Sequence, residues 1–213
     1  MKRTLLFWLH NPKLSRPKQL ALVGITALLL TAFIYWMFVA YQARTLRQQV
    51  TQVLPGASQF QQLQYFDRSW QPVDLGSDNE DSLYAGYDQT GQFVGYAVPG
   101  EGPGYQNPIR LLYGYRPEQR LIVGMKVLDS GETTGWGEQA LQDEDFLANF
   151  RALAVDPKLE VVESGEKDQP NEVDIMTGAT ISSQAIVQIL NATNRRWLRR
   201  LPASGSEPPL VNP

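Results

Sequence analysis

The sequence contains no cysteine and one histidine, His10, among its 213 residues. Without thiolates the chain cannot form disulfides, perform thiol catalysis, or bind zinc or an iron–sulfur cluster through cysteine. His10 lies in a short basic segment before an apolar run, a poor place for a metal ligand. Any redox chemistry of this chain must therefore use an organic cofactor, and we predict no metal site and no catalytic residue.

Charged residues are missing from residues 19–43. This apolar run exceeds the roughly 20 residues that a helix needs to cross the hydrocarbon core of a bilayer. Tyr35, Trp36 and Tyr41 cluster toward one end of it, as an interfacial aromatic belt would. A cleaved signal peptide is the nearest alternative, but its apolar region is only about 7–15 residues long. We predict a transmembrane helix over residues 19–43.

Acidic residues are absent before this run, and the basic ones that precede it are Lys2, Arg3, Lys13, Arg16 and Lys18. The positive-inside rule therefore places residues 1–18 in the cytoplasm and the remainder on the exported side. All 22 acidic residues and 14 of the 19 basic ones follow the run. This acidic balance argues against nucleic-acid binding, because neutralising phosphates needs a basic surface.

The exported part divides into a stalk, one domain and a tail. Residues 44–57 continue the helix out of the membrane as far as the Pro55-Gly56 pair, a strong helix breaker. Residues 58–200 form the domain, in which the stretch from about 58 to 81 shows no clear periodicity and is taken as irregular. Residues 201–213 are rich in proline, serine and glycine, a composition typical of a disordered tail.

The domain is predicted to belong to the α+β class. Short β-rich runs separated by turn residues cover 83–87, 93–98, 109–115 and 121–128. Their short connections favour a small antiparallel sheet. The acidic run 143–145 suits the positive end of a helix better than acid–base catalysis. Apolar residues recur at helical spacing from Ile181 to Trp197, which predicts an amphipathic helix.

The string Asp174-Ile175-Met176-Thr177-Gly178-Ala179-Thr180 stands directly before this helix. A phosphate on the Thr180 hydroxyl would lie at the first helical turn, where unpaired N–H groups and the helix dipole favour an anion. Gly178 and Ala179 leave the approach open. The alternative is that Thr177 or Thr180 is simply an N-cap. The string resembles the site where a flavin transferase attaches FMN to threonine through a phosphoester. The resemblance implies covalent FMN on Thr180, with Asp174, Thr177, Gly178 and Ala179 completing the pattern.

Two further strings resemble parts of the FMN-binding domain family. Residues 131–138 read Gly-Glu-Thr-Thr-Gly-Trp-Gly-Glu, similar to that family's Glu-Thr-Pro-Gly-Leu-Gly segment. Residues 100–109 resemble its Gly-x-Gly-Tyr-x-x-Pro-Ile turn, which would form one wall of the site. The residues implied to approach the flavin are Glu132, Thr133, Thr134, Gly135 and Trp136. Trp136 could stack on the flavin ring or pack beneath a tight turn.

The three strings together resemble the FMN-binding domain family, most nearly the G subunits of the Rnf ion-translocating electron transport complex. The C subunits of the sodium-translocating NADH:quinone reductase are related. The resemblance implies an electron-carrying flavoprotein that does not turn over a substrate alone. It also implies a single-pass protein of the bacterial inner membrane with a cytoplasmic N-terminus and a periplasmic domain. The implied partners are Rnf subunits A, B, C, D and E, membrane lipid and a flavin transferase, with NADH and ferredoxin as outer carriers.

Alternatives remain for the function of the chain and for the role of one arginine cluster. The chain could be a membrane-anchored periplasmic flavoprotein sensor or accessory electron carrier outside such a complex, or a flavin-free adaptor. Four arginines, Arg195, Arg196, Arg199 and Arg200, surround Trp197 at the end of the predicted helix. They suit the negative end of the helix dipole and solvation, and docking to anionic lipid or an acidic partner is the other possibility.

Overall fold

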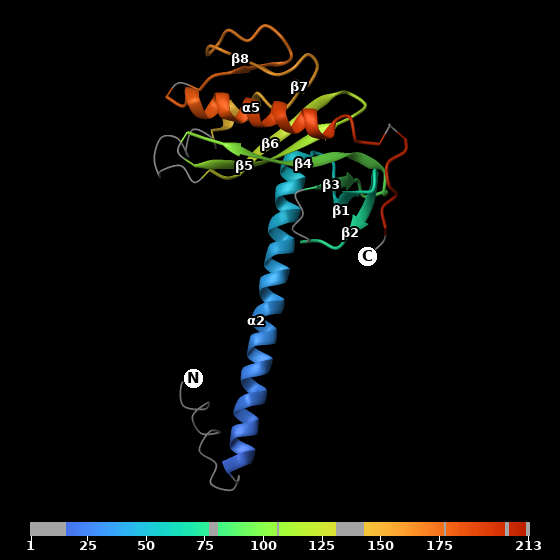
Figure 1. Ribbon diagram of the computed structural model, residues 1–213, viewed down its shortest axis with the longest axis vertical. Coiled ribbons are helices and arrows are strands. Elements are labelled where there is room, and N and C mark those ends of the chain that lie inside the picture. Colours follow the sequence, from blue (N-terminus) through green and yellow to red (C-terminus); the bar gives the residue numbers. More distant parts are fainter. Residues whose placement is uncertain are drawn as a thin grey trace. The chain divides into compact units, whose positions relative to one another are not determined.

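The computed structural model describes residues 16–76, 81–105, 107–130, 143–176, 178–202 and 205–211. The chain separates into two compact units, Met1–Thr45 and Leu46–Pro213. The helices are α2 (Arg16–Val53), α4 (Glu144–Ala148) and α5 (Thr180–Trp197). The strands are β1 (Gln59–Phe66), β2 (Ser69–Val73), β3 (Ser82–Tyr87), β4 (Phe93–Pro103), β5 (Pro108–Arg116), β6 (Leu121–Asp129), β7 (Leu153–Ala154), β8 (Glu160–Val162) and β9 (Glu172–Asp174). Figure 1 shows these elements as a ribbon.

Helix α2 is continuous over 38 residues. By length and composition its segment Gly24–Val53 could cross a membrane, and it is the one such helix in the described part of the chain. The large apolar side chains that it exposes are Ile25, Leu28, Leu29, Leu30, Phe33, Ile34, Tyr35, Trp36, Met37, Phe38, Val39 and Tyr41. Such a surface would be unstable in water and suits a lipid environment.

The last turns of α2 belong to the second unit. Val53 and Leu54 are fully buried in a cluster with Ala97 of β4 and residues of β5 and β6. The backbone of Val53 lies so close to the sheet that a Cβ on Gly114 would come within 1.9 Å of its carbonyl oxygen. The expectation of a separate stalk over 44–57 is therefore wrong from Leu46 onward, because this segment forms part of the domain core.

The main sheet has seven strands in the order β2-β1-β3-β4-β5-β6-β7, and each of its pairs is antiparallel. The predicted antiparallel sheet is confirmed, but it is larger than expected. Strands β1 and β2 occupy the stretch that the sequence led us to treat as irregular. The alternation of β1 is hidden by glutamines, two of which are buried and hydrogen-bonded: Gln61 to Tyr87, and Gln62 to Ser82.

The two faces of this sheet carry two separate hydrophobic clusters. On β5, Leu111 and Tyr113 join the cluster that includes α5, whereas Leu112 between them joins the cluster at the end of α2. Helix α5 lies across its face of the sheet (Figure 1) and buries Ile186, Leu190 and Trp197 there. The predicted amphipathic helix is thus present, with Ile181 as an exception because its side chain is exposed.

Strand β4 extends further than the sequence suggested. Residues 100–103 belong to this strand, and the turn expected from 100 to 109 is confined to the connection between β4 and β5, where Gly104 N donates to Asn107 O at 3.0 Å. Glycine is needed at 102 because a Cβ there would lie 2.7 Å from Cγ1 of Ile189. The missing side chain lets α5 approach the sheet closely.

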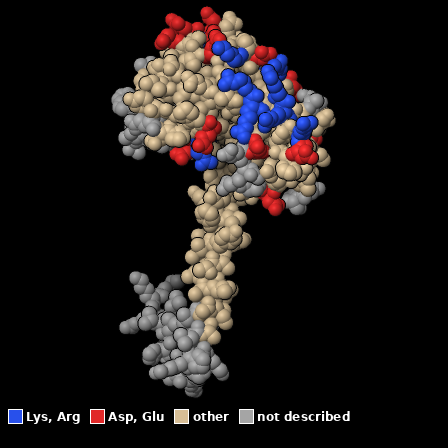
Figure 2. Space-filling view, viewed as in Figure 1, with Lys and Arg blue, Asp and Glu red and all other residues tan. Residues whose placement is uncertain are grey.

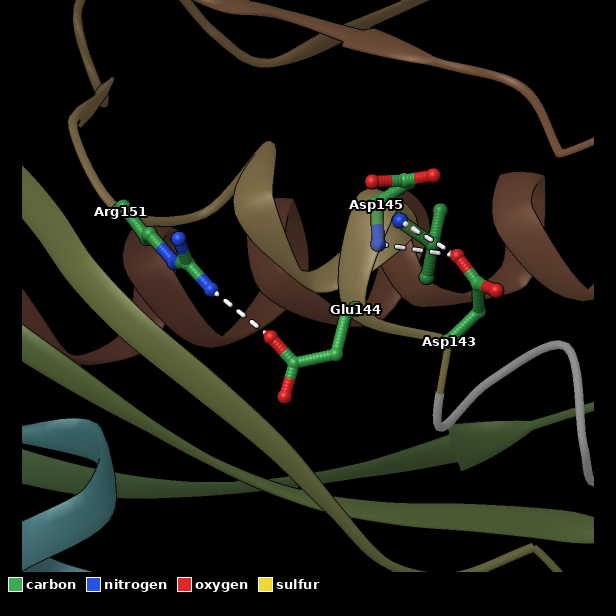
Figure 3. Close-up of polar contacts among 5 residues, drawn as sticks. Asp143, Glu144, Asp145 and Arg151 are labelled. Carbon is green, nitrogen blue, oxygen red and sulfur yellow. Dashed lines mark hydrogen bonds and ion pairs between the residues drawn. The ribbon is translucent and has the colours of Figure 1, made fainter.

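The acidic run 143–145 begins helix α4, as predicted (Figure 3). Asp143 is the N-cap, and its Oδ1 accepts hydrogen bonds from the N–H groups of Asp145 at 2.9 Å and Phe146 at 3.1 Å. Glu144 pairs with Arg151 at 3.1 Å. Asp143 and Glu144 therefore stabilise the start of α4 and its contact with Arg151.

The C-terminal segment differs from the expected disordered tail. Residues 205–211 lie against the sheet, where the Gln61 side chain bonds to Pro209 O and Val211 N and the Tyr87 hydroxyl bonds to Pro208 O. Composition favoured disorder, but it could not reveal that a buried amide and a phenol far away in the chain offer partners to this backbone.

We expect Gly114→Ala to destabilise the domain strongly, because the new Cβ would overlap the Val53 carbonyl. Overpacking of this kind typically costs about 1–3 kcal/mol. Thermal melting of the detergent-solubilised chain measures the effect. Gly24→Ala is the control, because a Cβ there meets no atom within 4 Å and its backbone does not have a positive φ. Equal losses in both variants would contradict close packing at Gly114.

We also expect the domain to lose stability at alkaline pH. Burial raises the pKa of Tyr87 from its ordinary value of 10.0 to about 12, and burial likewise raises the pKa of Tyr96, Tyr113 and Tyr115. The unfolded chain therefore loses these protons first. The stabilisation is fully present below pH 10 and is lost as the pH rises through about 12. Denaturation midpoints across this range test the sign, and Tyr87→Phe should flatten the decline.

Candidate cofactor-attachment site

The predicted attachment string joins β9 to α5. Strand β9 pairs in parallel with β8, and just after it Ile175 N donates to Val162 O at 2.9 Å. Thr177 lies outside the described residues. Gly178 and Ala179 lead directly to Thr180, the first residue of α5. The string thus begins at the end of a strand, which the sequence did not predict, and leads into the long helix that was predicted.

Gly178 is required by its backbone conformation. Its φ is +86°, in the left-handed region that residues with a side chain rarely adopt. A Cβ at this position would meet nothing within 4 Å, so lack of space does not explain the glycine. The open surroundings agree with the predicted access to the string. Ala179, by contrast, is only 5% exposed and packs inward.

Thr180 is exposed, and its hydroxyl makes no hydrogen bond to another residue in the described ranges. The N-cap of α5 is Ala179, which supplies no side-chain acceptor. The alternative in which Thr180 serves as N-cap is therefore wrong. Its hydroxyl is available for chemistry and is not committed to capping.

The start of α5 favours an anion. The first helical hydrogen bond runs from Ser183 N to Ala179 O at 2.9 Å, so the preceding N–H groups of α5 have no helical partner, and no side chain of the described residues caps them. The first turn contains no acidic residue, whereas the last turn contains Arg195 and Arg196. The positive end of the dipole is thus not compensated by a carboxylate of the helix itself.

Ser183 fixes the turn that presents Thr180. This fully buried side chain donates to Ala179 O at 3.0 Å and accepts from Met176 N at 3.3 Å. It therefore holds both ends of the 176–179 turn on the helix. No motif in the sequence pointed to Ser183. The available signal was a serine at an inward position of an apolar helix face, where its hydroxyl must bond to backbone.

Asp174 is half-buried at the end of β9, and its described contacts are structural. Its N–H donates to Asn149 Oδ1 at 3.1 Å, and its carboxylate accepts from Gly165 N at 3.2 Å. Asn149 is the C-cap of α4. Asp174 therefore fixes the exit of β9 to α4 on one side and to the 163–165 turn on the other.

The predicted flavin-facing residues Glu132, Thr133, Thr134, Gly135 and Trp136 lie outside the described residues. The register nevertheless shows where the chain enters this segment. Asp129, at the end of β6, pairs with Arg110 near the start of β5. On β4, Gly100 lies under Thr193 and Gly102 under Ile189, so α5 begins toward the same end of the sheet (Figure 1). The topology thus brings the chain to the end of the domain where Thr180 lies.

The arginines at the end of α5 are exposed, and two of them have internal partners. Arg196 pairs with Asp81 at 2.6 Å and lies over the Trp197 ring at 4.8 Å. Arg200 lies over the Tyr65 ring at 5.3 Å. Figure 2 shows lysine and arginine side chains gathered on one face of the domain. These contacts fit the simpler interpretation, a solvated basic end that complements the helix dipole.

We expect Ser183→Ala to loosen the turn before α5, because it leaves Met176 N and Ala179 O without this partner. Loss of a buried hydrogen-bonding side chain costs about 1–3 kcal/mol. Thermal melting provides the measurement. Gln184→Ala alters the exposed neighbour on the same helix and should change the melting temperature little. A neutral Ser183→Ala would show that the turn is held by other contacts.

Comparisons with known proteins agree on one family. The model of the FMN-binding domain matches residues 104–194. The chain is 32% identical to the G subunit of the ion-translocating oxidoreductase complex of Methanosarcina acetivorans, over 71% of this chain and 74% of that protein. It is 29% identical to the G subunit of the Na(+)-translocating ferredoxin:NAD(+) oxidoreductase complex of Acetobacterium woodii, over 70% and 72%.

Two solved structures share the fold. NqrC of Shewanella oneidensis aligns with a TM-score of 0.60 and 16% identity, covering 76% of this chain and all of that one. The C subunit of the Na(+)-translocating NADH-quinone reductase of Parabacteroides distasonis aligns with a TM-score of 0.59 and 17% identity, covering 75% and 92%. At this identity the likeness concerns the fold, and it agrees with the α+β class.

Proposed function

Because this chain belongs to the family of G subunits of ion-translocating oxidoreductase complexes, we propose that it is the FMN-carrying electron-transfer subunit of such a complex. Related G subunits bear the names of sodium- and proton-translocating ferredoxin:NAD(+) oxidoreductases. FMN supplies one-electron redox chemistry, while the protein provides position and electrostatics. The chain alone does not turn over a substrate; it passes electrons within a complex that moves ions.

The FMN is joined to Thr180 through a phosphoester. The observation that carries this proposal is the exposed Thr180 at the first residue of α5, whose hydroxyl has no hydrogen-bond partner among the described residues and whose helix has no side chain at its N-cap. A phosphate at that oxygen lies beside the unpaired N–H groups of the first turn. The left-handed Gly178 and the inward Ala179 support it, since together they turn the chain so that residue 180 stays outside.

The start of α5 also affects how readily the flavin is reduced. An anionic phosphoester on an acidic chain disfavours adding negative charge to the flavin. The positive end of the α5 dipole, which no acidic residue of its first turn compensates, opposes that effect. Glu132, Thr133, Thr134, Gly135 and Trp136 approach the flavin from the segment that follows β6. Backbone N–H groups near Gly135 would then stabilise the polar edge of the reduced ring.

Helix α2 anchors the protein in the membrane. We place its N-terminus in the cytoplasm and the FMN domain in the periplasm of a bacterial cell, following the basic residues before the span. The partners are Rnf subunits A, B, C, D and E, and a flavin transferase attaches the cofactor. Covalent attachment has a physical purpose on that side, because FMN lost from an exported domain is not readily replaced.

The attachment is tested by expressing the chain with its flavin transferase and viewing a denaturing gel under ultraviolet light. Fluorescence that survives denaturation is expected for the unaltered chain and should vanish in Thr180→Ala, which removes the phosphoester oxygen. Thr51→Ala, an exposed threonine on α2, should keep full fluorescence. Thermal melting of the same samples checks that Thr180→Ala remains folded.

A dark band from the unaltered chain would refute covalent flavin, and fluorescence retained in Thr180→Ala would move the attachment elsewhere. Membership in a complex is tested separately. Detergent extraction under mild conditions should copurify the other membrane subunits with this chain. A flavinylated chain that always purifies alone would favour a sensor or an accessory electron carrier.

A further inference from the structure

The C-terminal segment 207–211 lies on the sheet in the manner of a bound peptide. Its exposure alternates: Pro208 and Leu210 are partly buried, whereas Pro209 and Val211 are exposed. Leu210 packs against the main hydrophobic cluster. This period of two is that of an extended chain with one side on a surface. The segment therefore presents alternate residues to β1 and β3 and the others to solvent.

Gln61 of β1 recognises the backbone of this segment. Its buried side chain donates from Nε2 to Pro209 O at 3.0 Å and accepts at Oε1 from Val211 N at 3.0 Å. A primary amide carries a donor and an acceptor, so it can bond to a peptide backbone as a neighbouring strand would. Because both bonds go to backbone atoms, they fix the direction and register of the segment whatever its side chains are.

Tyr87 of β3 completes the match to two consecutive prolines. Its hydroxyl donates to Pro208 O at 2.5 Å and accepts from Gln61 Nε2 at 2.9 Å. Proline has a carbonyl but no N–H, so two prolines present acceptors only. The sheet supplies two donors: the Tyr87 hydroxyl bonds to Pro208 O and the Gln61 amide bonds to Pro209 O. The complementarity is thus specific for a segment that lacks donors at these two positions.

Glu207, the acidic residue before the prolines, has one carboxylate oxygen bonded within its own segment. Glu207 Oε2 accepts from Gly205 N at 2.8 Å, while its Oε1 and the Tyr96 hydroxyl are both buried without a hydrogen-bond partner among the described residues. Burial raises the pKa of Tyr87 and of Tyr96, and the Glu207 charge adds to this effect.

We propose that Gln61 and Tyr87 form a recognition site for an extended peptide of the pattern Pro-Pro-apolar, occupied in cis by residues 208–211. The few hydrogen bonds and the single apolar anchor give a modest intrinsic affinity. Covalent linkage raises the effective concentration of the segment, so it remains bound. A chain whose own segment is released accepts the same peptide in trans. The site lies on β1 and β3 and is independent of the proposed flavin attachment.

The test uses the full-length chain in detergent and a fluorescent synthetic peptide with the sequence of residues 205–213. Leu210→Asp places a charge at the apolar anchor and should release the internal segment. Fluorescence anisotropy should then show peptide binding at least about tenfold tighter to Leu210→Asp than to the unaltered chain, whose site is already filled. No binding to Leu210→Asp, or equal binding to both, would overturn the proposal.

Two controls show that binding uses the inferred contacts. Added to Leu210→Asp, Gln61→Ala should weaken binding by about tenfold, the loss expected for one pair of hydrogen bonds. Gln64→Ala should not, since Gln64 lies on the same strand at a position of opposite parity. A peptide N-methylated at Val211 lacks the donor to Gln61 and tests the same bond without altering the protein. Unchanged binding of the methylated peptide would contradict the proposal.

Discussion

The close contact between α5 and β4 determines where the candidate site lies. Gly100 and Gly102 remove side chains at the two points where Thr193 and Ile189 meet the strand. Helix α5 therefore packs on the sheet at short range, and its buried face fixes its rotation. Once that face points inward, Thr180 at the first turn is exposed to solvent. The orientation of the proposed attachment residue is thus a consequence of core packing on the same helix.

The start of α5 is held in a defined conformation although no side chain at its N-cap bonds to the first N–H groups. A long helix would ordinarily gain stability from a serine, threonine, asparagine or aspartate at its N-cap. Here Ala179 occupies that position, and the turn is held from below by the buried hydroxyl of Ser183. The helix therefore begins at a defined residue while its positive end stays uncompensated. This arrangement is suited to a phosphate supplied from outside the chain.

Several features could be predicted from the sequence because each depends on local chemistry. The uncharged run of residues 19–43 indicated a membrane helix, and the acidic residues 143–145 indicated the start of α4. The apolar periodicity after Thr180 predicted α5, and the string before it pointed to FMN. The folded chain distinguishes the members of that string. Thr180 is exposed and has no hydrogen-bond partner in the described ranges, whereas Ala179 packs inward and Asp174 supports neighbouring turns. For residues 132–136 the sequence-based prediction stands alone.

The long apolar helix, the α+β class and the candidate attachment string could be predicted from the order of the amino acids, since composition, periodicity and a continuous motif are enough to indicate them. The remaining features needed the folded chain. The glutamine-rich strand β1, the burial of the α2 end, the extension of β4 to Pro103 and the docking of residues 205–211 each depend on residues far away in the chain. Nothing in the sequence distinguishes a glutamine that will be buried, or a glycine that will lie under a helix, from any other. The reason for either residue appears only when the partner that bonds to it, or fills the space above it, is brought alongside by folding.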